Sequence, residues 1–215
     1  MSAADMDAAP TIDFYLGIGS RYSYLAATQI ARIERDRGCR FVWKPIASGA
    51  LLDRRGSNPF RQEPVSGQYD GAWREYDAKC WAAHYGVPFE EPKPFRVDPT
   101  VPALASLAAD AQGALVACCR QLMMMIFVER REIDDAAIAE LPALLGIDAR
   151  AFTDALEAPQ THIAHEALLE EARARGVFGV PTFVVDDRLF WGNDRLVLLE
   201  AALAGTPMPS GARQA

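Results

Sequence analysis

The sequence predicts an α/β protein with a large all-helical insertion, and three observations lead to this prediction. A strand, a helix and a second strand occupy residues 11–45. Residues 47–159 begin with a loop rich in Gly, Ser, Asn and Pro at residues 47–65, continue with helical patterns, and show no strand signal. A helix, two short strands and a last helix follow in residues 160–203. The strands from both ends of the chain are then expected to form one sheet, with the helical block inserted between them.

The first unit reads as two strands joined by a helix. Residues 11–16 alternate apolar and other side chains, which is the pattern of a strand with one buried face. Residues 17–19 interrupt it with two glycines, Ser20 is placed to cap the following helix, and Gly38 ends that helix. Residues 40–45 form the next strand, so we expect a right-handed βαβ unit.

The inserted block is predicted to consist of helices alone. Its helical patterns lie at about residues 71–85, 102–111, 115–130, 134–145 and 148–158. Asp134 and Asp148 suit helix starts, and Gly86 and Gly146 suit helix ends. We therefore expect a discontinuous domain of residues 11–46 and 160–206, a helical insertion domain of residues 47–159, and flexible tails at residues 1–10 and 207–215.

Composition and charge restrict the partners. Half of the 215 residues are apolar, and the formal net charge is −7. An acidic chain without a clustered basic face is unsuited to nucleic acid or to an anionic membrane surface. Residues 1–10 lack the basic start and apolar core of a signal peptide, and no apolar run is long enough to span a membrane. We expect a cytoplasmic protein.

The cysteines and histidines show no redox or metal-binding spacing. Cys39, Cys80 and the neighbouring pair at positions 118 and 119 form no Cys-x-x-Cys motif, so we expect reduced, mostly buried thiols. His162 and His165 lie one helical turn apart, but no third ligand is evident, and we expect no metal site.

The most specific signal lies in residues 176–195. They read Gly-Val-Phe-Gly-Val-Pro-Thr-Phe-Val-Val and, after a turn at residues 186–187, Arg-Leu-Phe-Trp-Gly-Asn-Asp-Arg. Pro181 removes an amide donor where a strand begins, and a cis Val180–Pro181 bond would mark a functional turn. The combination resembles the 2-hydroxychromene-2-carboxylate isomerases, which share the thioredoxin-like fold of kappa-class glutathione transferases and DsbA-type oxidoreductases.

This resemblance implies a thioredoxin-like fold that uses an external thiol. Where the oxidoreductases have Cys-x-x-Cys, this chain has Ser20, Arg21, Tyr22 and Ser23. The helix start still offers unpaired amides and a positive dipole end, which favour a thiolate. In the relatives the thiol is glutathione, and the serine matching Ser20 contacts its sulfur. The alternative is that Ser20 only caps the helix, and we expect a structural role for Ser23.

The resemblance also implies residues that hold glutathione. The backbone of Val180 before Pro181 would pair with the tripeptide as an added strand. An acidic side chain, Asp194, would pair with the γ-glutamyl ammonium, while amides near Asn193 would take the carboxylate. Asn58 matches a glutathione-contacting asparagine. Two alternatives stay open, because Asp194 could be a helix N-cap and Asn58 an ordinary surface residue.

The substrate is implied to be a small aromatic carboxylate. The relatives read Asp-Phe-x-Ser-Pro-Tyr-Ser, whereas this chain has Gly17 and Arg21 in place of the aspartate and the proline. Arg21 opposes the helix dipole, so we expect it to serve an anionic ligand. Lys44 matches a basic residue in the relatives, and Arg21 or Lys44 is predicted to hold the substrate carboxylate. Trp191 is predicted either to line the site or to pack in the core.

The predicted function is therefore a glutathione-dependent cis-trans isomerase that acts by reversible addition of the glutathione thiolate, with Ser20 as its catalytic residue. A kappa-like glutathione transferase would use the same site but consume glutathione. A non-catalytic thioredoxin-like binding module would keep the fold without using a thiol. The resemblance also implies a homodimer.

Overall fold

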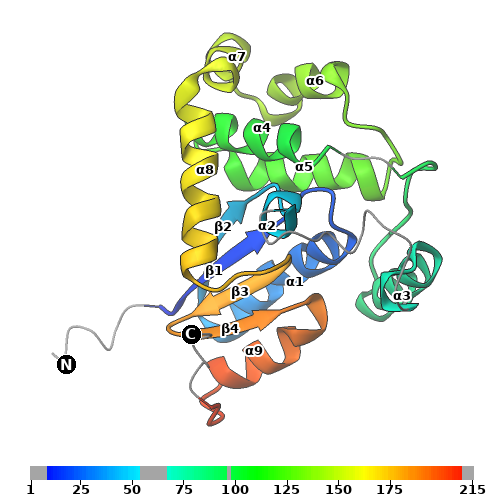
Figure 1. Ribbon diagram of the computed structural model, residues 1–215, viewed down its shortest axis with the longest axis vertical. Coiled ribbons are helices and arrows are strands. Elements are labelled where there is room, and N and C mark those ends of the chain that lie inside the picture. The colour runs from blue at the N-terminus through cyan, green and yellow to red at the C-terminus, as the bar shows by residue number, and fades with distance from the viewer. Residues whose placement is uncertain (1–8, 54–66, 96–97, 210–215) are drawn as a thin grey trace, which may run out of the picture.

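A computed structural model describes residues 9–53, 67–95 and 98–209 (Figure 1). Its strands are β1 (Thr11–Leu16), β2 (Arg40–Pro45), β3 (Thr182–Val185) and β4 (Arg188–Trp191). The flanking helices are α1 (Arg21–Arg37), α8 (Pro159–Ala174) and α9 (Leu196–Leu203). Between β2 and α8 lie α2 (Gly49–Asp53), a 3-10 turn η2 (Gly67–Tyr69), α3 (Gly71–Tyr85), α4 (Thr100–Asp110), α5 (Leu115–Phe127), α6 (Asp135–Leu145) and α7 (Ala149–Glu157).

The four strands form one mixed sheet in the order β2-β1-β3-β4. The pair β1 and β2 is parallel, as the predicted βαβ unit requires, and β3 is antiparallel to both β1 and β4. Leu16 lies opposite Pro45, so the ends of β1 and β2 reach the same edge of the sheet. Pro45 is tolerated because β2 is an outer strand that needs fewer ladder donors. The sheet thus joins segments from both ends of the chain.

Alternating side chains of the strands bury two different faces. Phe14 and Phe183 belong to the larger core with α1 and α9, and their rings stack with centroids 5.0 Å apart. Tyr15 and Val184 point the other way, into a smaller core with Leu169 of α8. Helices therefore cover both faces of the sheet, which confirms the predicted α/β, thioredoxin-like fold with its helical insertion.

The inserted helices begin and end where their capping residues stand. Asp134 and Asp148 accept hydrogen bonds from the backbone amides of Ala137 and Ala151. Gly86 and Gly146 adopt the left-handed conformation after α3 and α6. The predicted helix at about residues 115–130 is shorter in the structure, where α5 ends at Phe127.

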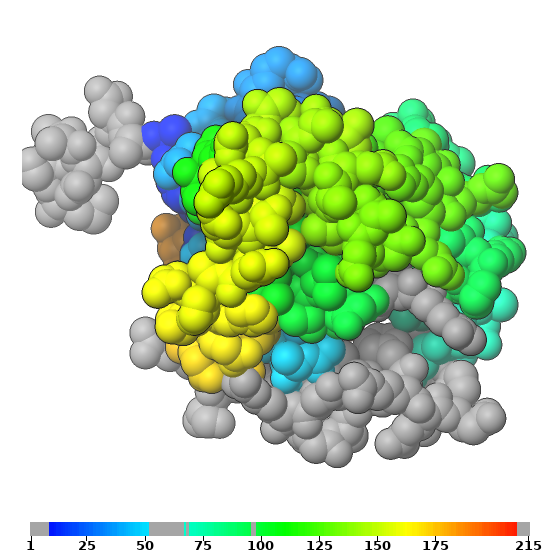
Figure 2. Space-filling model, turned by 90° about the horizontal axis from the view of Figure 1, so that it is seen from above, coloured from blue at the N-terminus to red at the C-terminus, as the bar shows by residue number. Residues whose placement is uncertain are grey.

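The insertion is not packed as a separate body. One buried cluster contains both strand residues such as Phe14 and insertion residues such as Leu122 and Phe127. Seen from above, α8 (yellow) lies directly beside the insertion helices (green), and α2 (cyan) lies below the green helices and beside the lower part of α8 (Figure 2). The division into two domains stays a prediction. In the part of the chain that the structure describes, no helix is long and apolar enough to cross a membrane.

Candidate active site

Ser20 caps α1 and leaves its hydroxyl proton available. Its backbone is extended, and its Oγ accepts a hydrogen bond from the backbone N–H of Ser23 at 3.2 Å. Because Oγ is the acceptor there, its own proton can be donated to another group. The amides and the positive dipole end of a 17-residue helix lie beside it. The predicted cap is confirmed, and this geometry is also suited to stabilising a thiolate.

Gly17 brings three separate segments together. A Cβ atom on Gly17 would lie 3.1 Å from Val180 Cγ2, 3.3 Å from Ser48 Oγ and 3.7 Å from Ser20 Cβ. The side chains of these three residues therefore surround one point at the start of α1. Ser23 has the expected structural role, because its buried hydroxyl accepts the Gly17 N–H at 3.3 Å. A larger residue at position 17 would push Val180 away from Ser20.

Ser48 also lies at the candidate site, and the sequence did not indicate it. It follows β2 by three residues, at the edge where the ends of the parallel strands β1 and β2 meet. Ligands of α/β proteins commonly bind beyond the carboxyl ends of such strands. Because Ser48 belongs to no motif, only this general rule could have pointed to it from the sequence.

The Val180–Pro181 peptide bond is cis, as the motif suggested. No described residue forms a backbone hydrogen bond with Val180, so its N–H and C=O are available for an extended ligand. The carbonyl of Pro181 accepts a hydrogen bond from Gly192 N at 2.9 Å. This bond places the predicted glutathione-binding residues at 180–181 beside those at 193–194.

Asn193 and Asp194 lie in a 3-10 turn, η3 (Asn193–Arg195), before α9. Asn193 is 3% exposed, and among the described residues no acceptor takes a hydrogen bond from its Nδ2. The backbone carbonyl of Asn193 accepts a hydrogen bond from the Tyr85 hydroxyl at 3.3 Å. Burial raises the pKa of Tyr85, so its hydroxyl stays protonated and remains the donor. The N-cap alternative for Asp194 is wrong, because its carboxylate pairs with Arg195 and α9 begins at Leu196.

Gly192 is required by the turn that carries Asn193 and Asp194. Its φ is +112° with ψ 153°, and an added Cβ would lie 2.3 Å from Asp194 Oδ1. We expect Gly192→Ala to lower the free energy of unfolding by about 2–3 kcal/mol, because both the backbone and the Asp194 side chain must move. Urea denaturation measures this loss. Gly205→Ala is the matched control, since Gly205 also has positive φ but open space around it. Equal losses in both variants would contradict the proposed steric conflict.

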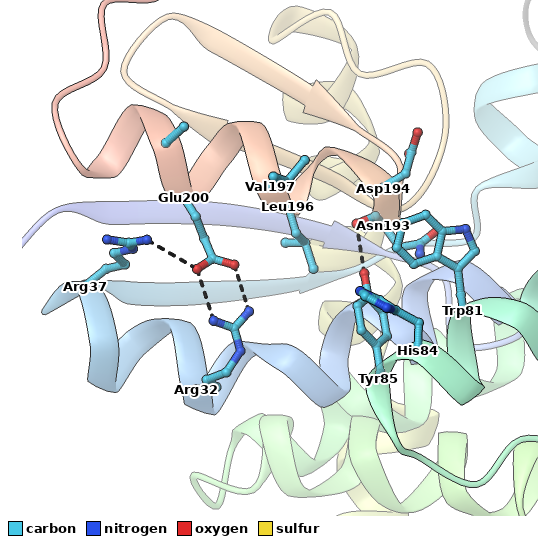
Figure 3. A pocket seen from close by; sticks show the side chains of 11 residues that line it. Arg32, Arg37, Trp81, His84, Tyr85, Asn193, Asp194, Leu196, Val197 and Glu200 are labelled. Atoms are coloured by element: carbon cyan, nitrogen blue, oxygen red, sulfur yellow. Dashed lines mark hydrogen bonds and ion pairs between the residues drawn. The ribbon is translucent and has the colours of Figure 1, made fainter.

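A cleft of about 410 Å³ lies between α1, α3 and α9 and is bordered by Asn193 and Asp194 (Figure 3). Trp81, His84 and Tyr85 of α3 form one wall. At the opposite end Arg32 makes two hydrogen bonds to Glu200, at 3.0 and 2.7 Å. Arg32 lies roughly 18 Å from Ser20 along α1 at 1.5 Å per residue. The cleft therefore borders Asn193 and Asp194 but does not contain Ser20.

The predicted substrate residue Arg21 forms a buried ion pair. Its Nε lies 2.6 Å from Glu91 Oε1 and its Nη2 lies 3.1 Å from Oε2. Both side chains are less than 9% exposed. Its Nη1 donates to the carbonyl of Gly71 at the start of α3, and the Phe95 ring lies against the guanidinium. Arg21 thus ties α1 to the segment after α3, and its charge is already balanced.

Lys44 and Trp191 also have defined surroundings. Lys44 pairs with Asp13 at 3.0 Å and with Glu171 of α8, so two protein carboxylates already balance the charge of its ammonium. Trp191 is 49% exposed, and its ring packs edge-on against Phe178 with centroids 4.9 Å apart. The expectation that Trp191 is a core residue is wrong, and the indole instead covers Gly179 beside the cis bond. Asn58 lies outside the described residues.

The buried thiols and the histidine pair show no metal centre. Burial raises the pKa of the Cys118 thiol to about 12, and Cys119 is likewise fully buried, whereas Cys80 is exposed. Within residues 9–53, 67–95 and 98–209, no group of three or more His, Cys, Asp or Glu side chains is placed to hold a metal ion.

A four-stranded sheet, a helix that starts at a capped serine and a neighbouring cis-proline loop define a thioredoxin-like protein without the redox cysteines. Residues 11–204 match the DSBA-like thioredoxin domain family. The chain is 32% identical over 195 residues to the 2-hydroxychromene-2-carboxylate isomerase of Sphingobium xenophagum, covering 90% of this chain and 97% of that protein. The chain belongs to the 2-hydroxychromene-2-carboxylate isomerase family of DsbA-like proteins.

Solved structures show the same fold. A 2-hydroxychromene-2-carboxylate isomerase superposes with a TM-score of 0.77 at 24% identity, covering 91% of this chain and 95% of that one. The cytosolic disulfide reductase DsbM from Pseudomonas aeruginosa, solved with GSH, gives a TM-score of 0.59 at 20% identity, covering 90% and 99%. The names of the sequence relatives support an isomerase function for this chain.

Proposed function

We propose that this protein is a glutathione-dependent cis-trans isomerase of a chromene-type aromatic carboxylate. The glutathione thiolate adds to a conjugated carbon of the substrate, and the former double bond becomes a single bond that can rotate. Elimination of the thiolate then breaks the new carbon–sulfur bond and restores the double bond in the other geometry. No atom is gained or lost, so glutathione is a catalyst and is not consumed.

The observation that carries this proposal is the position of Ser20. Its hydroxyl stands at the amide end of α1, and Val180 of the cis-proline loop lies beside the same glycine. A hydroxyl donor and a helix dipole both favour a thiolate over a thiol. The chain has no cysteine at this point, so the sulfur must be supplied by a ligand. The GSH bound to DsbM, a protein of the same fold, is consistent with such a ligand.

The neighbouring backbone and side chains suit a peptide-like thiol. The available N–H and C=O of Val180 fit the main chain of the tripeptide as an added strand. The buried Asn193 Nδ2 donates no hydrogen bond to any described residue, so it can donate one to a ligand oxygen near the γ-glutamyl end. Asp194 supplies the negative charge for the γ-glutamyl ammonium, because its pair with Arg195 lies at the exposed surface and can be exchanged for the ligand. The carboxylate of the aromatic substrate is assigned to neither Arg21 nor Lys44, because Glu91, Asp13 and Glu171 already balance their charges.

Calorimetric titration with reduced glutathione, together with an ultraviolet spectrum of the complex, tests the proposal. We expect binding and a thiolate absorption band at neutral pH. Product formation from an aromatic enol acid should leave the glutathione concentration unchanged. Loss of glutathione in step with product would identify a transferase instead. Absence of binding at millimolar glutathione would refute the thiol mechanism. The same samples give the molecular mass by light scattering, which tests the predicted homodimer.

A further inference from the structure

His165 of α8 contacts the backbone beside the candidate site. Its Nε2 accepts a hydrogen bond from the backbone N–H of Ala47 at 3.0 Å, and its side chain is 4% exposed. An acceptor nitrogen carries no proton, so the imidazole is neutral with its proton on Nδ1. The proposed mechanism uses neither His165 nor Ala47, and the contact joins segments 118 residues apart.

Ala47 begins the segment that carries Ser48 into the site. The preceding residue, Ile46, donates to the Leu16 carbonyl at 2.9 Å and so continues the β1–β2 pairing. The Ala47 carbonyl accepts the amide of Ala50 at 2.9 Å, which starts α2. With its N–H bound to His165 and its C=O bound within α2, Ala47 is held on both sides. Its neighbour Ser48 is then fixed against Gly17.

The helix that carries His165 is itself attached to the sheet. The Tyr15 hydroxyl donates to Glu171 Oε1 at 2.7 Å, and Lys44 pairs with the same carboxylate. Leu169 lies in one buried cluster with Leu51 of α2. Figure 2 shows α2 (cyan) lying against α8 (yellow). Helix α8, which carries His165, is therefore held in place by the sheet and α2. Loss of the hydrogen bond at the His165 ring would then affect the position of Ala47 and its neighbour Ser48.

Protonation of His165 removes this contact. An imidazolium has two N–H donors and no acceptor, so it cannot bind the Ala47 amide. Burial lowers the pKa of His165, while Glu166 raises it and His162 lowers it, both from the same helix. Other charged residues stand on the helices α4 and α7, which pack against α8; they are Asp110, Arg150, Asp154 and Glu157, and none of them shifts this pKa.

The neutral imidazole is favoured above the ordinary histidine pKa. The unfolded chain binds the proton more readily than the folded one, so stability rises with pH between the lowered pKa and about 6.5. Inside this window the folded protein keeps the Ala47 contact while its stability declines, and the contact itself is lost only as the pH falls through the lowered pKa of His165.

We propose that His165 is a positioning residue, which holds Ala47 so that Ser48 and the start of α2 form the wall of the thiol site opposite Val180. This inference deepens the proposed glutathione function and rests on it. Loss of the contact leaves the chemistry of Ser20 in place but misplaces Ser48, so the site binds its thiol ligand more weakly.

Two variants separate the acceptor from the bulk of the ring. His165→Gln places Oε1 near the position of Nε2 and accepts the Ala47 amide without titrating. His165→Leu fills similar space without an acceptor. The probe is S-methylglutathione, whose sulfur does not titrate, measured by calorimetry between pH 5 and pH 8. We expect wild-type affinity to fall as the pH drops through the lowered pKa of His165, which lies below the ordinary value of about 6.5. We expect His165→Gln to show little pH dependence and His165→Leu to bind about tenfold more weakly at every pH.

The inference is overturned if His165→Gln keeps the wild-type pH dependence, or if a folded His165→Leu protein binds like the wild type. Nitrogen-15 NMR of the wild-type protein provides the second measurement. As His165 titrates, the amide signals of Ala47, Ser48 and Gly17 should shift with the same midpoint. If the analogue does not bind, the glutathione function fails, and this titration still decides whether His165 positions the segment. Amide signals that stay unchanged would overturn the positioning role.

Discussion

Ser20→Ala is expected to lower turnover by about a hundredfold, the typical effect of removing one preorganised donor from a developing or stabilised anion. The Ser20 hydroxyl proton is available because its oxygen is the acceptor toward Ser23. Without it, the pKa of bound glutathione should rise and its thiolate band should weaken at neutral pH. Glutathione itself should still bind through the backbone of Val180. Turnover with saturating glutathione and the pH dependence of the thiolate absorbance measure both effects.

The same substitution also removes a helix cap, which costs about 1 kcal/mol of stability. Asp148→Ala is the matched control, because Asp148 caps α7 by accepting the Ala151 amide at 2.7 Å, on a helix outside the candidate site. We expect this variant to lose similar stability and to keep wild-type turnover. If both variants lose activity to the same small degree, Ser20 is only a cap and the thiolate role is wrong.

Glu91→Gln is expected to destabilise the fold by about 3–5 kcal/mol, because the Arg21 guanidinium remains buried and charged without its partner. The two side chains are 8% and 4% exposed and meet through two contacts. Burial raises the pKa of Glu91, and Arg21 acts against that change. Chemical denaturation of the variant measures the loss. Glu140→Gln is the control, since Glu140 makes a similar two-contact pair with Arg131 at the exposed surface and should cost less than about 1 kcal/mol.

The double variant Arg21→Met with Glu91→Leu separates structure from substrate binding. Replacing both charges with apolar groups of similar size is expected to restore most of the stability. If the restored protein keeps the wild-type KM for the aromatic acid, Arg21 is structural. A KM at least tenfold higher in a stable double variant would instead support the sequence-based prediction that Arg21 holds the substrate carboxylate.

Much of the fold could be predicted because its signals are local. The strands at residues 11–16 and 40–45 follow from periodicity, and the helix at 71–85 follows from periodicity together with Gly86 at its end. The end of α5 was predicted three residues too late. The Glu90 amide donates to the Phe127 carbonyl at 2.7 Å, and this partner comes from a distant segment that no local pattern reports.

The residues of the candidate site likewise fall into those indicated by local sequence and those placed only by the fold. Ser20, Pro181, Asn193 and Asp194 were found because a cap, a Val-Pro turn and the Gly-Asn-Asp-Arg motif are written in consecutive residues. By itself the sequence determined the strand and helix order, the missing redox cysteines and the family resemblance. Only the tertiary structure decided which charges remain for a ligand, because Glu91, Asp13 and Glu171 reach Arg21 and Lys44 from other segments. It also placed Ser48 and His165, since contacts between residues far apart in the chain depend on how the elements pack and leave no periodic trace in the sequence.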